Sequence, residues 1–388
     1  MVSTLLGDKR TNIRRAIFLV LAVGFAVFLY FFNQVEIYPL LNQEGTSYEK
    51  ARVVQIVTDN IQEDGTRAGS QTVELEILGG KYKGQTFEAQ SLSGYLYGAD
   101  CQPGMDVTAY ISASGDNVQV SVYNYYREPV LYVLIGLFLL ILWAIGGKRG
   151  LKSAVGLVFT FICIIFLYLP MLYRGYSPFL AAVVVVILTT AVTMYLIGGA
   201  TVKTLSSILG TVAGVVVAGI VATVFGNLAH ISGYNVEEIE TLISIQNVSN
   251  MQIGGLLFSG ILIASLGAVM DVSMSVASTI NEIYDQNPAL TMKALLKSGI
   301  NVGRDMMGTM SNTLILAFCG SSLNTLVITY SYAMPYHQIM NMYSIGIEIL
   351  QGISGTMGVI LTVPLVSVIA SWLVTRKKQV PHLEKAES

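Results

Sequence analysis

The stretch Pro178–Ile197 reads PFLAAVVVVILTTAVTMYLI, and no charged side chain interrupts it. A helix of about 20 predominantly apolar residues is long enough to cross the hydrocarbon core of a bilayer. Soluble globular proteins carry roughly a quarter charged residues, whereas this chain of 388 residues is 12% charged and 53% hydrophobic. The stretch therefore predicts a transmembrane helix, and the composition predicts that it is one of several.

Other apolar stretches of similar length occur on both sides of this one. They cover residues 17–32, 130–145, 154–172, 205–225, 253–272, 306–328 and 345–374. The last is long and contains Pro364, which predicts a tilted or kinked helix. We therefore predict an α-helical polytopic membrane protein with about eight transmembrane helices.

The first stretch has two interpretations. Its basic start and apolar core are also typical of a secretory signal peptide. No cleavage site of small residues follows it, because the chain continues with Asn33, Gln34, Val35 and Glu36. An uncleaved membrane anchor is therefore favoured over a cleaved signal.

Basic residues mark the predicted cytoplasmic side. With the N-terminus inside, the inner segments hold most of the Lys and Arg residues, as the positive-inside rule requires. Arg174 is the one basic residue in a short outer loop. The pattern predicts a multi-pass protein of the cell membrane with both termini in the cytoplasm. The inner basic residues beyond the N-terminus are Lys148, Arg149, Lys152, Lys203, Lys293, Lys297, Arg304, Arg376, Lys377, Lys378 and Lys385.

A region of different character follows the first stretch. Polar and apolar residues alternate over 51–57, 72–77, 106–111 and 118–122, with glycine-containing turns between them. This alternation is typical of half-buried strands and predicts a small all-β domain, such as an OB-like barrel, outside the cytoplasm. We favour a structural or regulatory cap over a ligand-binding barrel, because no aromatic or basic groove is recognisable. The predicted domains are residues 1–32, the cytoplasmic N-terminus and first anchor; 33–128, the β-rich domain; 129–375, seven membrane helices; and 376–388, a basic cytoplasmic tail.

Polar residues recur at helical spacing on both sides of the inner loop that follows residue 272. Spacings of three and four place such residues on one face of a helix. Two polar stripes, joined by a hairpin, could therefore face each other. The first stripe is Asp271, Ser275, Ser278 and Glu282, and the second is Asn301, either Arg304 or Asp305, Gly308 and Asn312.

Two interpretations of the stripes stay open. Ionisable residues at membrane depth are costly unless paired or wetted, so they are functional candidates. In one interpretation Asp271, Glu282 and Asp305 are ion or proton sites of a hydrophilic pathway, and Arg304 is their counter-charge. In the other, the stripes belong to amphipathic helices at the cytoplasmic interface, because Asp271 and Arg304 are predicted at the ends of their spans.

Glu348 is a further candidate near the outer end of the last span. It shares one helical face with Gln351, Gly352 and Gly355, where small residues permit close approach of helices. The polar pair could line a cavity, and a simple interfacial Glu is the alternative. The complete candidate pathway is Asp271, Ser275, Glu282, Arg304, Asp305, Asn312 and Glu348.

Three stretches carry these polar residues in a fixed order: AVMDVSMS at 268–275, NEI at 281–283 and NVGRDMMGTMSNTL at 301–314. They resemble the YibE/F-like family of bacterial membrane proteins, and the resemblance extends over about 125–372. The preceding β-rich region resembles the N-terminal part of the longer family members. The resemblance implies the multi-pass architecture and the importance of Asp271, Glu282, Arg304, Asp305 and Asn312. It implies no ligand.

These observations favour a gradient-driven permease for a small solute or ion over two alternatives. The first alternative is an accessory, scaffold or sensor protein that acts through its outer β domain. The second, an intramembrane enzyme, is disfavoured because no nucleophile–base pair is recognisable. We expect no cofactor, since Cys101, Cys163 and Cys319 make no metal-binding spacing. The expected partners are the bilayer, a small solute or cation, and another copy or membrane protein; a net charge of -2 argues against nucleic acid.

Overall fold

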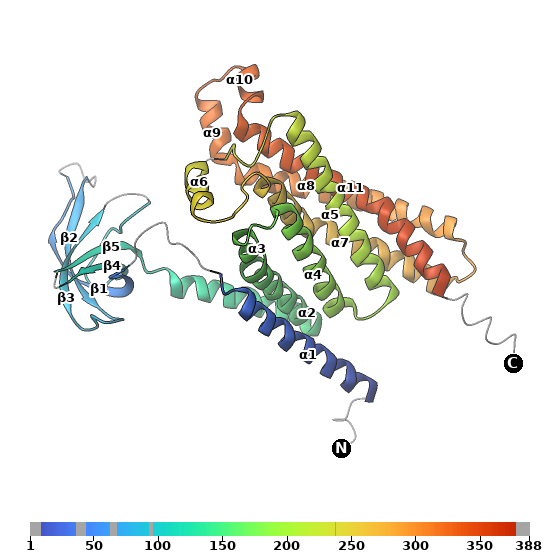
Figure 1. The fold of residues 1–388 in the computed structure, drawn as a ribbon, viewed down its shortest axis with the longest axis horizontal. Coiled ribbons are helices and arrows are strands. Elements are labelled where there is room, and N and C mark those ends of the chain that lie inside the picture. Colours follow the sequence, from blue (N-terminus) through green and yellow to red (C-terminus); the bar gives the residue numbers. More distant parts are fainter. Residues whose placement is uncertain are drawn as a thin grey trace. The chain divides into compact units, whose positions relative to one another are not determined.

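A computed structural model describes residues 9–35, 44–62, 68–92, 96–115, 117–236 and 238–377. The chain folds as two compact units (Figure 1). One unit contains the described residues of 39–145, and the other contains those before and after. The predicted basic tail lies outside the described residues from Lys378 onward.

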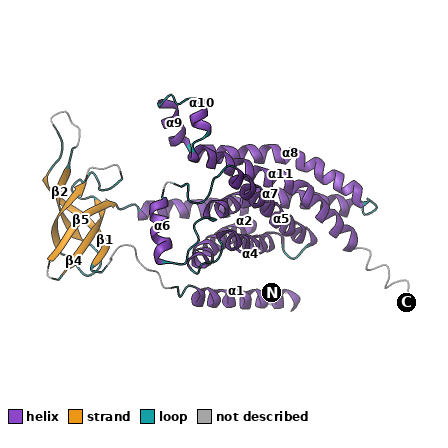
Figure 2. Cartoon of the chain, turned by 45° about the horizontal axis from the view of Figure 1, so that its top comes forward, coloured by secondary structure: helices purple, strands orange, loops and turns teal. Residues whose placement is uncertain are grey.

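The first unit contains a closed five-stranded barrel with the strand order β1-β2-β3-β5-β4 (Figure 2). Neighbouring strands are antiparallel, except that β3 and β5 run parallel. The predicted small β domain is therefore confirmed as a mixed barrel. The strands are β1 (Thr46–Thr58), β2 (Ser70–Ile77), β3 (Thr86–Leu92), β4 (Asp106–Ser114) and β5 (Asn117–Tyr125).

Alternation along the strands builds the interior of the barrel. In β2, Val73, Leu75 and Ile77 point inward and are fully buried, as the period of two in a strand requires. Strand β3 was absent from the predicted runs, because its inward positions are the small Ala89 and the polar Ser91. The hydroxyl of Ser91 donates to the carbonyl of Ala99 and accepts from its amide, so burial leaves it satisfied.

The second unit is helical, and the first unit also ends in a helix. Within the described ranges, five helical segments are long and apolar enough to cross a membrane, or six if a bent pair counts as one span. The prediction of a multi-pass membrane protein is confirmed at this level. The long segments are α2 (Glu128–Cys163) with η1 (Ile164–Tyr168) and α3 (Leu169–Tyr173), α4 (Pro178–Gly198), α5 (Val202–Leu228), α7 (Leu256–Gln286) and α11 (Tyr343–Lys377), and the bent pair is α8 (Met292–Ser321) with α9 (Leu323–Ser331). Shorter helices are α1 (Lys9–Phe32), with an apolar part at Val20–Phe32, α6 (Ile239–Val248) and α10 (Tyr336–Met340).

Helix α2 is interrupted between two of the predicted spans. At Gly147 the backbone has φ 53° and ψ −135°, which is not helical. Glycine adopts positive φ without the steric cost that a Cβ imposes. The break lies between the predicted spans 130–145 and 154–172, and it coincides with the boundary between the two units.

The predicted span 306–328 is not one straight helix. It divides into α8 and α9, which are bent by 62° at a break. The break follows Gly320 and Ser321, and the Ser321 hydroxyl donates to the carbonyl of Phe318. Glycine and serine favour helix ends because glycine is flexible and the serine hydroxyl competes for backbone groups.

Two helices extend further than their predicted spans. Helix α7 continues past residue 272 to Gln286, and α8 begins at Met292 with its N-cap at Thr291, whose hydroxyl accepts from the amide of Ala294. Apolar windows end where polar residues begin, whereas helical hydrogen bonding continues through them. Asp271 is consequently the middle residue of α7, although it still lies at the end of the apolar stretch 253–272.

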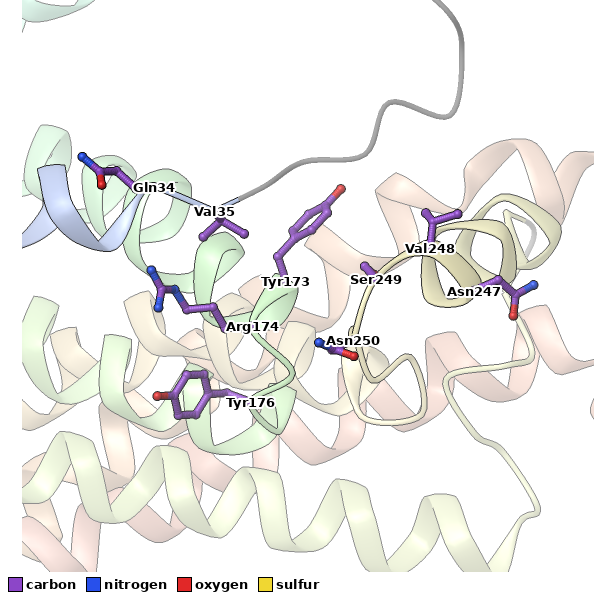
Figure 3. A pocket seen from close by; sticks show the side chains of 9 residues that line it. All are labelled: Gln34, Val35, Tyr173, Arg174, Tyr176, Asn247, Val248, Ser249 and Asn250. Atoms are coloured by element: carbon purple, nitrogen blue, oxygen red, sulfur yellow. The ribbon is translucent and has the colours of Figure 1, made fainter.

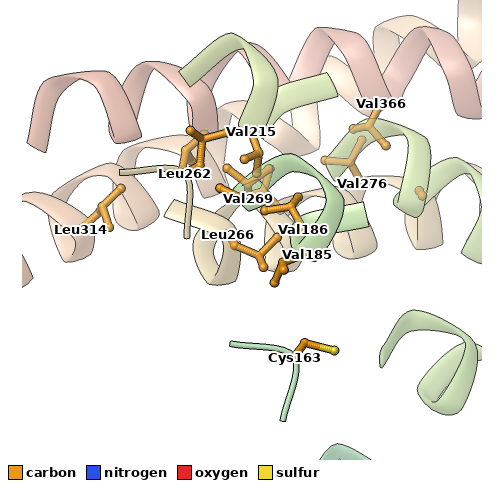
Figure 4. Packing of buried hydrophobic residues seen from close by; sticks show 14 of the residues in the cluster. Cys163, Val185, Val186, Val215, Leu262, Leu266, Val269, Val276, Leu314 and Val366 are labelled. Atoms are coloured by element: carbon orange, nitrogen blue, oxygen red, sulfur yellow. The ribbon is translucent and has the colours of Figure 1, made fainter. Parts of the chain in front are cut away.

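Helices α4, α5, α7, α8 and α11 pack around a common core (Figure 4). Val215, Leu262 and Val269 lie close together there, and Val366 lies beside Val276. Glycines bring the backbones together: a Cβ on Gly210 would lie 2.7 Å from the Cβ of Val366. Such small residues are the usual means of close helix packing in lipid.

Candidate functional site

The first polar stripe lies on the outward face of α7. Asp271 and Glu282 are exposed and Ser275 is partly buried. The opposite face carries Val276 and Ile280, which are fully buried in the core. Helical spacing predicted that the stripe residues share a face. The burial pattern directs Asp271 and Glu282 away from the bundle, whereas Ser278 is partly buried and its hydroxyl accepts from Lys203 of α5 at 3.5 Å.

Contacts with α5 show which part of that helix lies beside Asp271. A Cβ on Gly210 would lie 3.3 Å from the hydroxyl of Ser273, and one on Gly214 would lie 3.0 Å from Val269. Asp271 lies between Ser273 and Val269 along α7, so it is level with the segment of α5 between the two glycines. This segment is close to the middle of α5, a helix suited to cross a bilayer. A carboxylate at such a depth needs a partner, water or protonation.

The second polar stripe lies on the outward face of α8. Asn301, Arg304, Asp305 and Asn312 are all exposed. The buried positions of the helix are small or apolar and are Leu295, Gly299, Gly303 and Leu314. The predicted shared face is present, and it is directed out of the bundle.

The two stripes do not face each other. A Cβ on Gly299 would lie 2.6 Å from Ile280, so α7 and α8 meet through their buried faces. Asp271, Arg304 and Asp305 form no side-chain hydrogen bond or ion pair with any residue that the structure describes. The two helices are antiparallel. Counting nine residues from this contact leads to Asp271 on α7 and to Gly308 on α8. Asp271 is therefore level with the middle of the α8 stripe.

Glu348 lies apart from both stripes. It is partly buried on α11, and its Oε2 is enclosed without a hydrogen-bond partner in the described part of the chain. It lines an otherwise apolar cavity of about 190 Å³ between α11, the end of α8 and α9, together with Phe318, Cys319 and Leu326. The structure therefore does not join Glu348 to the other candidate residues.

A larger hollow of about 730 Å³ lies between the end of α1, the end of α3 and the segment after α6 (Figure 3). Its lining is mostly polar and includes Arg174, whose guanidinium donates to the carbonyl of Phe32 at 3.0 Å and lies 4.5 Å from the ring centroid of Phe32. Arg174 thus ties α3 to α1. The sequence did not predict this hollow. The relevant sequence feature was Arg174, the one basic residue in a predicted short outer loop. The lining residues are Gln34, Val35, Tyr173, Arg174, Tyr176, Asn247, Val248, Ser249 and Asn250.

The barrel carries an aromatic cluster that sequence reasoning also missed. The ring centroid of Tyr48 on β1 lies 5.2 Å from that of Tyr110 on β4 and 5.0 Å from that of Tyr123 on β5. Tyr123 is at a register shift, between Val122 and Asn124, which pair with consecutive residues of β4. A bulge of this kind redirects a side chain. The cluster joins three strands, so no local sequence pattern could indicate it.

Groups that could hold a metal ion are absent from the described ranges, in which no three His, Cys, Asp or Glu side chains come together. The cysteines are free: Cys101 and Cys163 are buried and Cys319 is exposed. The arrangement can therefore supply carboxylates, a guanidinium and amides at depth, without a described set of metal ligands.

Comparison with known proteins gives one match. The family model described as YibE/F-like protein matches residues 134–376, which is close to the range of the resemblance in the sequence. A search of curated proteins and a search of solved structures found no match.

Proposed function

This chain belongs to the YibE/F-like family, and we propose that it is a gradient-driven permease for a small polar solute or cation. The observation that supports the proposal is the position of Asp271 at the middle residue of α7, level with the α8 stripe. Membrane proteins retain ionisable groups at such positions mainly where they serve a solute, ion or proton path. We expect no chemical conversion of the solute.

The carboxylates are the coupling groups in this proposal. A carboxylate that is exposed alternately to water and to a low-dielectric environment changes its proton affinity, and can release or exchange a proton or cation. Asp271 provides this group at mid-helix, and Ser275 adds a neutral ligand one turn away. Arg304, Asp305 and Asn312 form the second polar face of the candidate pathway. Glu282 lies further along α7, toward the inner end.

The proposed topology keeps eight spans. Six described spans qualify by length and composition when the bent pair counts as one. Dividing α2 at Gly147 adds a seventh crossing, and α1 adds the eighth. The basic residues Lys148, Arg149 and Lys152 then lie beside the Gly147 break on the cytoplasmic side, as the charge rule favours. Both termini are cytoplasmic and the barrel is extracytoplasmic, and its strand order suits an OB-like barrel.

The hollow at Arg174 fits the outer end of this topology. It is bounded by the C-terminal end of α1, which the proposed orientation places outside. Amides and tyrosines such as Gln34, Asn250 and Tyr173 offer hydrogen bonds to a hydrated solute. We infer that this hollow is the outer vestibule of the permease.

Purified protein in proteoliposomes tests the proposal. An imposed potassium diffusion potential drives ion movement, and a trapped pH-sensitive dye reports proton flux. We expect protein-dependent flux that Asp271→Asn abolishes and that Asp285→Asn, near the inner end of the same helix, leaves intact. Flux that is equal in Asp271→Asn and wild type would remove Asp271 from the pathway.

A second candidate function rests on the tyrosine cluster of the barrel. Exposed aromatic rings supply contact area at low entropic cost and are enriched at binding surfaces. In this alternative the barrel docks an extracytoplasmic partner through Tyr48 and Tyr123. Cross-linking in intact cells discriminates the two: Tyr48→Ala with Tyr123→Ala removes a captured partner in the docking model, whereas Asp271→Asn does not.

A further inference from the structure

The outward face of α8 has no partner in the described chain. We call Asn301, Arg304, Asp305, Gly308 and Asn312 the α8 polar stripe; all five are exposed. We propose that a second copy of the chain covers this stripe, with the two α8 helices packed side by side about a two-fold axis normal to the membrane. The protein is then a homodimer, whether or not it transports a solute.

The depth of the stripe is the first argument. A Cβ on Gly303 would collide with Val363 of α11, and one on Gly214 of α5 would collide with the adjacent Thr362. Gly303, which precedes Arg304, therefore packs on the same part of α11 as Gly214, a residue near the middle of α5. Lipid tails offer neither hydrogen bonds nor counter-charges at this level, so an Arg and an Asp there require protein or water.

The second argument is that the stripe complements itself. Parallel helices related by a two-fold axis place each residue at the height of its own copy. Arg304 of each protomer then lies beside Asp305 of the other, which gives two ion pairs from one pair of neighbours. The two residues cannot satisfy each other within one helix, because adjacent side chains diverge by about 100° around the helix axis.

The neutral members of the stripe fit the same axis. Asn301 and Asn312 carry both donors and an acceptor, so each amide can bond to its own copy across the axis. Gly308 lies between them, and nothing lies within 4 Å of the position its Cβ would occupy. A glycine at this position lets two helix backbones approach closely. An unrelated membrane protein would need its own matching set of charges and amides.

Cysteine cross-linking in membranes locates the interface. The full-length chain carries Cys319→Ser, which removes the exposed native thiol, together with Asn312→Cys. The matched control is Ile187→Cys in the same background, since Ile187 is also exposed (44%) and lies near the middle of α4. We expect oxidation to convert Asn312→Cys to a disulfide-linked dimer and to leave Ile187→Cys monomeric. No dimer from Asn312→Cys, or cross-linking only to a different protein, would overturn the proposal.

Subunit counting tests the ion pairs. Single-molecule photobleaching of the full-length protein in lipid vesicles should show two subunits for wild type and one for Arg304→Asp or Asp305→Arg. The double variant restores a self-complementary pair and should regain the dimer. Arg304→Gln, which removes the charge without reversing it, serves if a reversal variant fails to fold. A monomeric wild type, or dimers in all single variants, would contradict the proposed pairing.

Discussion

The charged side chains of the barrel and of the helical unit differ in how they are paired. On the barrel, Asp106 accepts from Arg52 at 2.9 Å and contacts Lys50 at 2.7 Å, so a partly exposed carboxylate is paired twice. In the helical unit, Asp271 and Arg304 are exposed without a described partner. A charge facing water is solvated at little cost, whereas one facing lipid is not. An exposed charged side chain is therefore ordinary in the barrel, whereas in the helical unit it indicates a missing neighbour.

Removal of a core side chain from the barrel should give the largest effect. Leu75 is fully buried, and Leu75→Ala should cost about 2–5 kcal/mol of barrel stability through lost burial and a residual cavity. Hydrogen exchange on the full-length protein should show faster exchange in β1–β5 and unchanged protection in α5, α7 and α11. Leu92→Ala, at a position 59% exposed, is the control and should change little. Equal loss of protection in both units would show that they do not unfold separately.

Crowding of a helix contact should come next. A Cβ on Gly303 would meet Val363, so Gly303→Ala should force α8 away from α11 and cost about 1–3 kcal/mol. Thermal unfolding of the purified protein in detergent measures this change. Gly267→Ala, at a position with nothing within 4 Å, should keep or gain stability because alanine favours helices. A stable Gly303→Ala would mean that α8 and α11 are less closely packed.

Neutralising a carboxylate should have opposite signs in the two units. Asp271→Asn removes a charge from mid-depth and should raise the melting temperature in lipid by a few degrees. Asp106→Asn removes the carboxylate that pairs with both Arg52 and Lys50, and it should therefore lower the stability of the barrel. Hydrogen exchange resolves the two units in one sample. A loss of stability in both variants would show that Asp271 is already paired in the membrane.

Acid should produce the smallest effect, confined to the barrel. Hydrogen bonding from Arg52, and then from Lys50, lowers the pKa of Asp106 below its ordinary value. The Asp106 carboxylate contributes its full stabilisation above the pKa of Asp in the unfolded chain, about 4. As the pH falls below this value, the unfolded chain binds a proton before the folded chain does. The stabilisation is therefore lost as the pH falls through the folded-state pKa. The stability of β1 and β4, followed by exchange, should therefore be constant above about pH 5 and decline below it. In Asp106→Asn this part of the decline should disappear.

Much of the architecture could be predicted from local patterns. Apolar runs such as 178–197 indicated the membrane helices, and alternation in 72–77 indicated strands, because both signals depend on neighbours in sequence. Strand β3 escaped prediction because Ala89 and Ser91 give no apolar alternation. The apolar spans of α7 and α8 ended too early because hydropathy stops at the first charged residue, whereas the helical spacing of the polar stripes correctly extended both helices beyond them.

The sequence by itself determined the membrane character of the chain, the β-rich insert and the shared faces of Asp271 with Ser275 and of Asn301 with Asn312. Helical periodicity fixes which residues share a face, but it cannot tell which direction that face takes. Only the packing of Gly299, Gly303 and Gly210 against their neighbours decided that Asp271 and Arg304 point out of the bundle. This direction depends on contacts between helices distant in sequence, and those contacts exist only in the folded protein.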